Sequence, residues 1–381
     1  MKILIITGIF PPEIGGPATY SDLLLREFVV RGFDIKILTY SYVKQKFPIF
    51  YVSKKWPKGL RHIIFLAKLF FLATKSDLIL SADASFGAGF MAALVSRLLC
   101  KKFIVRVTGD YAWEQGVARF GVKDLLDDFL PLQFHQNYSL AVRCLAKLQS
   151  WTVCSADKII APSEYLKKII LRWGVSESKI KVISNGIVLP QVSELREELR
   201  GIFSFKGLTI LSVGRLVPWK GFAALMDVFS DLLSTISGAQ LIIIGDGPER
   251  AALELQISNS KLSIKILNKM PQAELFKYIK ASDVFVLNTA YEGFSHQLVE
   301  VMDLGVPIIT TNVGGNSEII TSGENGILVP YNDKEKLKTS LLKLLGDETL
   351  RNKLATAGLV TAQKFTDEKM ISELIKVINI L

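Results

Sequence analysis

The chain has 381 residues, more than one hydrophobic core usually serves, so two domains are expected. Hydrophobic residues make up 49% of it, which excludes an intrinsically disordered chain. The net charge is +10, and the excess lies in residues 1–190, which hold 26 Lys and Arg against 14 Asp and Glu. An anionic surface or acceptor is therefore expected at the N-terminal half, and nucleic acid is not expected as a partner.

The three cysteines, Cys100, Cys144 and Cys154, have neither metal-ligand spacing nor the pairing of a disulfide framework, which is typical of a reducing compartment. The apolar run 2–7 is soon followed by two prolines and has no small-residue cleavage site. It is predicted to be a strand rather than a signal peptide. These features predict a cytoplasmic protein.

Strands and helices alternate through the N-terminal half, as they do in a doubly wound parallel sheet. Apolar runs rich in β-branched residues predict strands at 2–7, 33–39, 77–81, 103–108, 157–161 and 181–187. Helices are predicted at 18–30, 87–99, 124–153 and 163–173. Ser163 is the expected N-cap of the last of these.

A glycine loop follows the first predicted strand and precedes a helix. This layout can cradle a phosphate, although the Gly-x-Gly-x-x-Gly of dinucleotide-binding proteins is absent. The paired Gly15 and Gly16 either approach a ligand closely or form a simple turn with positive φ.

A basic segment follows the second predicted strand, with no acid between Val43 and Ser76. Within it, residues 60–73 are strongly apolar but too short to span a bilayer. They are predicted to form either a helix packed on the sheet or a partly interfacial helix whose lysines meet anionic headgroups. The cations of residues 44–75 are Lys44, Lys46, Lys54, Lys55, Lys58, Arg61, Lys68 and Lys75, and the aromatic residues beside them are Phe47, Phe50, Tyr51 and Trp56.

Polar residues follow the strand 103–108 at its carboxyl end, where parallel sheets bind ligands. Asp110 is the carboxylate of this group, and it lies where a side chain could contact a bound ligand. The alternative is that its carboxylate caps a helix or makes a loop hydrogen bond.

The second half repeats the alternating pattern after a linker that begins at Asn185. Strands are predicted at 208–213, 240–248 with its terminal glycine turn, 283–287 and 325–330. Helices are predicted at 193–200, from 271, from 295, from 333 and at 367–381.

A loop with two cations follows the strand 208–213, and glycines lie at both of its ends. Arg215 offers a bidentate fork and Lys220 a point charge, which together suit a diphosphate. The alternative is a solvated loop without a ligand.

The strand 283–287 leads into a second glycine loop with Gly293 and Phe294, and Ser295 then opens a helical pattern. A helix N-terminus at the end of a parallel strand offers unpaired N–H groups to a phosphate. Glu292 precedes this helix and Glu300 lies within it, about 12 Å away if all eight intervening steps are helical. They are therefore predicted to accept hydrogen bonds from different parts of one long ligand, with an ordinary solvated Glu300 as the alternative.

The Glu-x7-Glu spacing, followed by Gly-x-Pro at 305–307 and Gly-Gly-x-x-Glu at 314–318, resembles the donor-site signature of retaining nucleotide-sugar glycosyltransferases of family GT4. The cation loop and the Gly-Asp-Gly-Pro at 245–248 resemble further elements of that family. The resemblance implies that Glu292 contacts the donor sugar and Glu300 the nucleotide ribose. It assigns the donor diphosphate to Arg215 and Lys220, and it places Gly15 and Gly16 beside that diphosphate and the acceptor.

The fold implied by this resemblance is GT-B, an α/β fold of two facing doubly wound Rossmann-like domains with the active site in the cleft between them. Residues 1–190 are then the acceptor domain and residues 205–360 the donor domain. The final helix, 367–381, packs back on the acceptor domain in this fold.

Two positions depart from the family pattern. Many relatives carry a histidine where this chain has Thr108, which leaves the acceptor side without an imidazole. The resemblance then implies that Asp110 is the nearest replacement for orienting or deprotonating an acceptor hydroxyl. Relatives usually carry glycine at Asn268, beside the nucleobase, so the base of the donor stays open.

The expected function is transfer of a hexosyl unit from a UDP- or GDP-linked sugar to a glycan or lipid-linked acceptor, with retention at the anomeric carbon, in cell-envelope or polysaccharide assembly. No cofactor is expected, and no metal, because the chain has no Asp-x-Asp. The basic segment 44–75 predicts peripheral attachment to the inner face of the cytoplasmic membrane. The alternatives are a catalytically silent nucleotide-sugar binder and an epimerase or phosphorylase on the same architecture.

Overall fold

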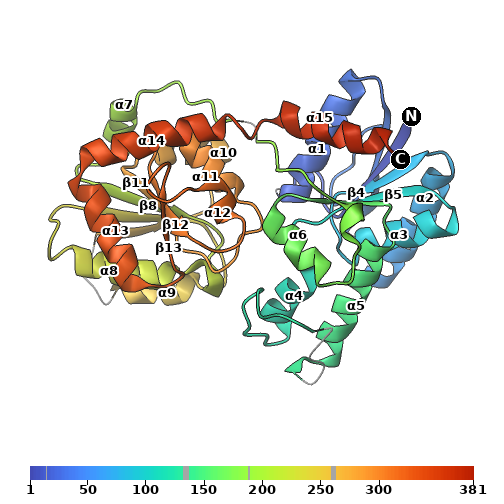
Figure 1. Cartoon of the computed structure of the whole chain (residues 1–381), viewed down its shortest axis with the longest axis horizontal. Coiled ribbons are helices and arrows are strands. Elements are labelled where there is room, and N and C mark those ends of the chain that lie inside the picture. Colours follow the sequence, from blue (N-terminus) through green and yellow to red (C-terminus); the bar gives the residue numbers. More distant parts are fainter. Residues whose placement is uncertain (14, 132–136, 188, 259–262) are drawn as a thin grey trace. The chain divides into compact units, whose positions relative to one another are not determined.

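The computed structural model describes the chain except for residues 14, 132–136, 188 and 259–262. The chain forms two compact units (Figure 1). The first comprises Met1–Ser184 with Ile371–Leu381, and the second comprises Asn185–Met370. The sequence-based boundary at residue 190 lies a few residues beyond this division, and the C-terminal residues rejoin the first unit.

The first unit is built on a seven-stranded parallel sheet in the order β3-β2-β1-β4-β5-β6-β7. The strands are β1 (Lys2–Thr7), β2 (Asp34–Ser41), β3 (Ile49–Ser53), β4 (Leu78–Ser81), β5 (Lys102–Arg106), β6 (Lys158–Ala161) and β7 (Ile180–Val182). The helices are α1 (Gly16–Val30), α2 (Lys58–Thr74), α3 (Gly89–Leu98), α4 (Tyr111–Arg119), α5 (Leu140–Cys154), α6 (Glu164–Leu171) and, from Ile371 onward, α15 (Asp367–Asn379).

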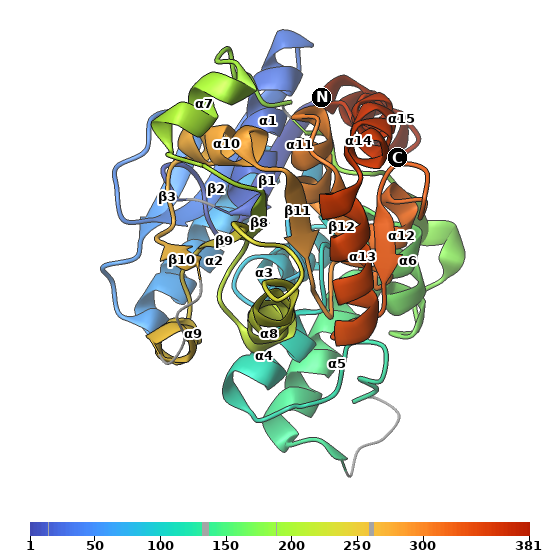
Figure 2. The same cartoon turned by 90° about the vertical axis from the view of Figure 1, so that its left-hand side faces the viewer.

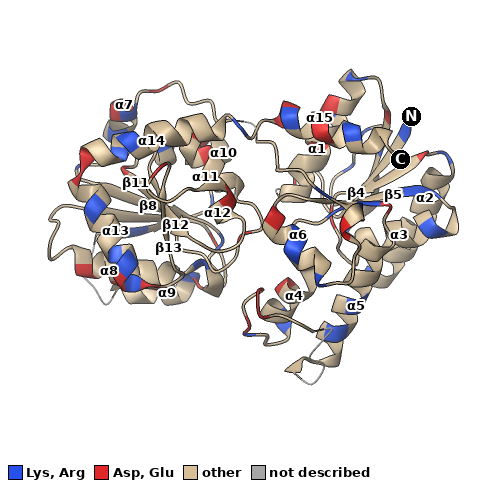
Figure 3. Ribbon diagram, in the orientation of Figure 1, with Lys and Arg blue, Asp and Glu red and all other residues tan. Residues whose placement is uncertain are grey.

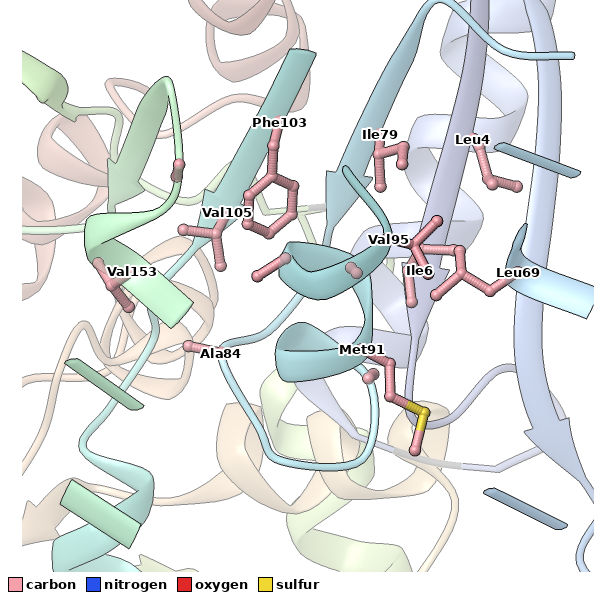
Figure 4. Packing of buried hydrophobic residues seen from close by; sticks show 14 of the residues in the cluster. Leu4, Ile6, Leu69, Ile79, Ala84, Met91, Val95, Phe103, Val105 and Val153 are labelled. Atoms are coloured by element: carbon pink, nitrogen blue, oxygen red, sulfur yellow. The ribbon is translucent and has the colours of Figure 1, made fainter. Parts of the chain in front are cut away.

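Successive side chains of β1 point to opposite faces of the sheet. Leu4 and Ile6 enter a fully buried cluster with α2 and α3, and Figure 4 shows Val95 of α3 close to Ile6 and to Leu69 of α2. α1 packs on β1 and β2. Each fully buried side chain of this size contributes about 1.5–3 kcal/mol, which holds the strand ends in place.

The second unit has a six-stranded parallel sheet in the order β10-β9-β8-β11-β12-β13 (Figure 2). The strands are β8 (Thr209–Val213), β9 (Gln240–Ile244), β10 (Ile264–Leu267), β11 (Val284–Leu287), β12 (Ile308–Thr311) and β13 (Ile327–Val329). The helices are α7 (Arg196–Ile202), α8 (Phe222–Leu232), α9 (Arg250–Ser258), α10 (Gln272–Ala281), α11 (His296–Asp303), α12 (Asn316–Ile319), α13 (Lys334–Gly346) and α14 (Glu348–Ala362).

Two hydrophobic clusters cover the two faces of this sheet. Phe285 and Leu287 of β11 pack with α10 and α11, whereas Val284 and Val286 pack with α8 and α13. Every residue of β11 is therefore apolar, because a strand of a parallel sheet is buried on both of its faces. In both sheets the strand order reverses beside the first strand of the unit, at β1/β4 and at β8/β11, and ligands of parallel sheets bind at such points.

The prediction of a helix over 124–153 is wrong at its start, because α5 begins only at Leu140, with Ser139 as its N-cap. Residues 132–136 of that range lie outside the described part. Leu126 and Phe129 are nonetheless buried, so the apolar spacing reflects turns packed on the core rather than a helix. The predicted strand 181–187 also ends early, at Val182.

Several elements were not predicted, among them β3, α4, α8, α9, β10 and β12. β3 is an edge strand flanked by lysines and prolines, so its apolar pattern is short, and α4 contains Gly116 and several polar residues. Among the helices of the described residues, none is long and apolar enough to cross a membrane.

Candidate functional site

The loops that follow β8 and β11 meet at the switch point of the second sheet. The Lys220 ammonium forms an ion pair with the Glu292 carboxylate, and both side chains are largely buried, at 16% and 19% exposed. The loops are also joined through their backbones, because the Ala290 N–H donates to the Trp219 carbonyl at 2.7 Å. A cation and an anion from distant loops are thus held together at the carboxyl edge of the sheet.

Gly221 ends the cation loop and begins α8 with a φ of 57°, in the left-handed region that favours glycine. A Cβ there would lie 2.5 Å from both the Asn288 side-chain nitrogen and the Asn288 carbonyl oxygen. The backbone of the cation loop therefore lies directly against the end of β11, which sets the direction of Lys220. The Arg215 side chain is exposed, and within the described residues it makes no hydrogen bond or ion pair.

The Gly-Gly pair of the sequence signature packs on the loop that carries Glu292. A Cβ at Gly314 would lie 2.1 Å from the Glu292 carbonyl oxygen, and a Cβ at Gly315 would lie 2.4 Å from the Gly293 carbonyl oxygen. The Gly315 N–H donates to the Glu292 carbonyl at 2.9 Å. These two glycines are needed because backbone meets backbone here, and the contact fixes the Glu292 loop.

α11 begins beside this loop, as predicted. The Ser295 hydroxyl accepts a hydrogen bond from the Leu298 N–H at 3.4 Å, which confirms Ser295 as the N-cap. The buried Phe294 packs edge-on against Phe365, with ring centroids 5.3 Å apart. The first N–H groups of a helix have no intrahelical partner and carry partial positive charge, so this end of α11 suits an anion.

His296 makes a side-chain contact that sequence reasoning did not predict. Its Nε2 lies 2.7 Å from the side-chain nitrogen of Asn185, which begins the linker. Residues 292–296 therefore contact both ends of the second unit's chain. Asn185 is the first residue of that unit, and Phe365 lies shortly before its last residue, Met370.

Glu300 lies inside α11 and has a different partner from Glu292. Its carboxylate accepts a hydrogen bond from the Gln272 side chain of α10 at 2.9 Å. Burial raises the pKa of Glu300 from 4.5 to about 7, and the bond from Gln272 opposes this only in part. A carboxyl with this pKa changes its charge near neutral pH.

The first unit places Gly15 and Gly16 at the start of α1. Gly15 is the N-cap with a φ of 166°, which is extended backbone, so the alternative of a turn with positive φ is wrong. The Gly15 carbonyl accepts bonds from the Ala18 N–H at 3.0 Å and the Thr19 N–H at 3.1 Å. A Cβ at Gly16 would meet no atom within 4 Å, so the loop leaves open space there.

Charged residues at the carboxyl ends of β4 and β5 were also missed by sequence reasoning. Asp83 follows β4 and accepts hydrogen bonds from the Gly8 N–H at 3.4 Å and the Ser85 N–H at 2.9 Å. Arg106 ends β5, is buried, and lies over the Tyr20 ring of α1 with its guanidinium carbon 3.8 Å from the ring centre. Burial lowers the pKa of Arg106, and Tyr20 and Asp83 oppose this shift. The only sequence signal was their position at the ends of predicted strands.

Asp110 is the N-cap of α4. Its carboxylate accepts a hydrogen bond from the Trp113 N–H at 2.9 Å, and the residue is 3% exposed. It lines a cavity of about 20 Å³ together with Gln149 and Trp173. Burial raises the pKa of Asp110, and the bond from Trp113 opposes the shift. The geometry favours the capping interpretation, and a role toward an acceptor stays a prediction.

We expect Asp110→Asn to keep transfer activity within a few-fold of the parent, because asparagine caps helices as well as aspartate does. Asp110→Ala removes the cap and lowers the free energy of unfolding by about 0.5–2 kcal/mol. Denaturant unfolding and steady-state rates measure the two effects. A well-folded Asp110→Asn variant that has lost transfer would show instead that the carboxylate acts on the acceptor.

Within the described residues, no group of three or more His, Cys, Asp or Glu side chains could hold a metal ion. The predicted donor residues Arg215, Lys220, Glu292 and Glu300 all lie in the second unit, on loops or a helix that start at its carboxyl edge. Gly15, Gly16 and Asp110 lie in the first unit.

Family models match both units in turn. The model "Glycosyltransferase Family 4" matches residues 14–190, and the model "Glycosyl transferases group 1" matches residues 196–360. The chain belongs to glycosyltransferase family 4. This glycosyltransferase therefore has the GT-B fold of two doubly wound α/β domains that its two parallel sheets display.

Relatives of this glycosyltransferase cover it to different extents. An uncharacterised glycosyltransferase of Methanocaldococcus jannaschii is 24% identical over 373 residues, 92% of this chain and 91% of its own length. The capsular polysaccharide biosynthesis glycosyltransferase CapM of Staphylococcus aureus is 32% identical over 238 residues, and the match spans 58% of this chain but only 60% of CapM.

Solved structures agree in fold over the full length. The crystal structure of HepE from Anabaena in complex with UDP covers 100% of both chains with a TM-score of 0.78 at 20% identity. The complex of HepE with UDP-glucose gives a TM-score of 0.77, also at 20% identity and with full coverage.

Proposed function

We propose that this glycosyltransferase moves a hexosyl unit from a nucleotide diphosphate sugar to an acceptor hydroxyl, with retention at the anomeric carbon. The observation that carries the proposal is the Lys220–Glu292 pair beside the N-terminus of α11, at the switch point of the second sheet. The complexes of HepE with UDP and UDP-glucose support a UDP-linked sugar as the donor. The name of CapM supports a role in polysaccharide or glycolipid assembly.

The proposed chemistry needs positive charge where the donor diphosphate leaves. The Lys220 ammonium, the exposed Arg215 and the first N–H groups of α11 supply it, without a step that depends on a divalent metal. The acceptor oxygen bonds to the anomeric carbon while the bond from that carbon to the phosphate oxygen breaks. The leaving phosphate oxygen takes the acceptor proton on the same face, so retention follows and no strong protein base is required at Thr108 or Asp110.

Each glutamate has its own role in this proposal. Glu292 accepts hydrogen bonds from the donor sugar, and Lys220 is released from it to the diphosphate when the donor binds. Glu300 accepts hydrogen bonds from the ribose hydroxyls, for which its carboxylate must be ionised. Gly293 and Phe294 shape the loop between the two glutamates, and Gly15 and Gly16 lie against the diphosphate and the acceptor.

We expect nucleotide binding to weaken as the pH falls below about 7, because Glu300 with its raised pKa then carries a proton. The sign for stability is opposite. The folded apo protein holds this proton between about pH 4.5 and 7 while the unfolded chain loses it, so stability falls as the pH rises through that window.

Calorimetric titration with the free nucleotide at pH 6, 7 and 8 measures this dependence. Glu300→Gln should bind more weakly at pH 8 and should lose the part of the pH dependence that belongs to residue 300. The titration of the diphosphate itself is common to both proteins and cancels in the comparison. Glu292→Gln is the contrast, since it should spare binding of the free nucleotide and damage transfer. Identical pH profiles for the parent and Glu300→Gln would contradict the assignment of Glu300.

The proposed function is tested by nucleotide release. A thermal-shift screen with UDP, GDP and ADP selects the base, and release of that nucleotide from its sugars is then measured with and without candidate acceptors. Acceptor-dependent release and an unchanged anomeric configuration in the product, read by NMR, are expected. Tight donor binding with no release under any acceptor would instead favour a silent binder.

We further propose that the acceptor is lipid-linked or otherwise anionic, and that the protein works at the inner face of the cytoplasmic membrane. The basic segment 44–75 supports this proposal. Not all of its cations are available. Lys54 is paired with Glu13 and only 15% exposed, while Lys44, Lys46, Lys55 and Lys58 are exposed.

A further inference from the structure

α2 has two apolar faces. Phe65, Leu69 and Leu72 are buried in the core of the first unit, which confirms, for this face, the first of the two predicted alternatives, a helix packed on the sheet. A second set of apolar residues is exposed to solvent and includes Ile63 at 67% and Phe71 at 60%. Most surface helices are polar on the side that faces water, so α2 has apolar area that the fold does not use.

The exposed set forms one continuous stripe along the helix. Its members are spaced by three, four, three and one residues, which keeps them on one side at 3.6 residues per turn. We call it the α2 stripe, and it consists of Leu60, Ile63, Ala67, Phe70 and Phe71. The buried set lies about half a turn away, so the stripe points away from the sheet.

At helical spacing, Arg61, Lys68 and Lys75 lie along one side of the stripe. α2 itself carries no acid (Figure 3). The Lys75 ammonium lies over the Phe71 ring, 4.3 Å from its centre, and Arg61 lies 5.8 Å from the centre of the Tyr40 ring. Lys68 donates to the Tyr51 carbonyl at 2.9 Å while staying exposed. An amphipathic surface with aromatic side chains and cations, and without acids, complements an anionic lipid surface.

We propose that the α2 stripe inserts into the headgroup region of an anionic bilayer, with Arg61, Lys68 and Lys75 at the level of the lipid phosphates. The inference rests on the proposed site of action but not on the proposed transfer chemistry. The proposed site of action rests on the cations of residues 44–75. The stripe adds an apolar surface that inserts, so binding should need apolar side chains as well as lysines.

The stripe variant carries Ile63→Ser, Phe70→Ser and Phe71→Ser. Its control carries Leu98→Ser and Leu140→Ser, which change apolar residues of the same unit that are 65% and 70% exposed and lie outside the stripe. Both proteins and the parent are sedimented with vesicles of phosphatidylcholine alone or mixed with phosphatidylglycerol, at low and high salt. These vesicles contain no acceptor, and thermal unfolding of all three proteins is measured in parallel as a check on folding.

The parent should bind mixed vesicles and lose binding at high salt or without the anionic lipid. The stripe variant should bind at least about 10-fold more weakly, because each buried methylene contributes to partitioning, while the control binds as the parent does. Phe71→Trp should add fluorescence that brominated lipids quench, whereas Leu140→Trp should not be quenched.

Three results would overturn the inference. If the stripe variant binds like the parent, charge alone attaches the protein and the stripe has no role. If the parent forms a dimer by light scattering that the stripe variant does not form, the stripe joins two copies of the chain. If the parent ignores anionic vesicles, both the membrane site and the stripe proposal fail, while nucleotide release still decides the transfer chemistry.

Discussion

Lys220→Ala is expected to lower kcat/KM for the nucleotide sugar by roughly 10²–10³, which corresponds to about 2.7–4 kcal/mol of transition-state stabilisation. The reason is that the leaving diphosphate gains charge in a partly buried place where Lys220 is only 16% exposed. Arg215→Ala should have an effect of the same kind, because Arg215 lies on the same loop and offers a second cation to the diphosphate. Steady-state rates with saturating acceptor measure both variants.

The Lys220–Glu292 pair complicates a single substitution, because the loss of Lys220 also leaves Glu292 without its counter-ion. A double-mutant cycle with Glu292→Gln separates the two effects, and we expect non-additive losses because the residues are in contact. Lys277→Ala is the control, since it breaks a second lysine–glutamate pair of the same unit, the more exposed pair with Glu194. Full turnover by Lys220→Ala and Arg215→Ala with every nucleotide sugar would show that this loop does not hold the diphosphate.

Gly314→Ala is expected to displace the loop that carries Glu292, although the two residues are far apart in the sequence. The new methyl group would lie 2.1 Å from the Glu292 carbonyl oxygen, and the φ of 57° adds strain for any residue with a Cβ. The left-handed backbone costs about 1–2 kcal/mol, and the forced shift of the loop adds about 1–3 kcal/mol. Because the shift moves Glu292 itself, transfer should fall by roughly 10–100-fold.

Gly323→Ala is the matched control, since Gly323 also has a positive φ, of 84°, but its Cβ would meet nothing within 4 Å. It should lose stability through backbone strain alone and keep its kcat/KM. Thermal unfolding and donor kinetics of the two variants separate strain from displacement of the loop. Equal activities would mean that Gly314 does not support the Glu292 loop.

Local pattern predicted well wherever a few adjacent residues decide the structure. Ser163 and Ser295 precede apolar helical patterns, and both are N-caps whose hydroxyls accept the expected backbone bond. The apolar pattern predicted a helix wrongly at Leu126 and Phe129. These side chains are buried, but they lie in turns rather than on a helix. The pattern also missed β3, whose position at the sheet edge needs only a short apolar run.

The sequence by itself determined the alternating α/β architecture and the family signature at the strand ends, because strand, turn and capping preferences act over a few neighbouring residues. Only the tertiary structure decided which distant groups meet. It brought Lys220 to Glu292, 72 residues away. It also showed that Lys54 forms an ion pair with Glu13 and is largely withdrawn from solvent. It also divided the apolar residues of α2 between core and solvent, since the strand order and the packing of each helix determine which faces are covered.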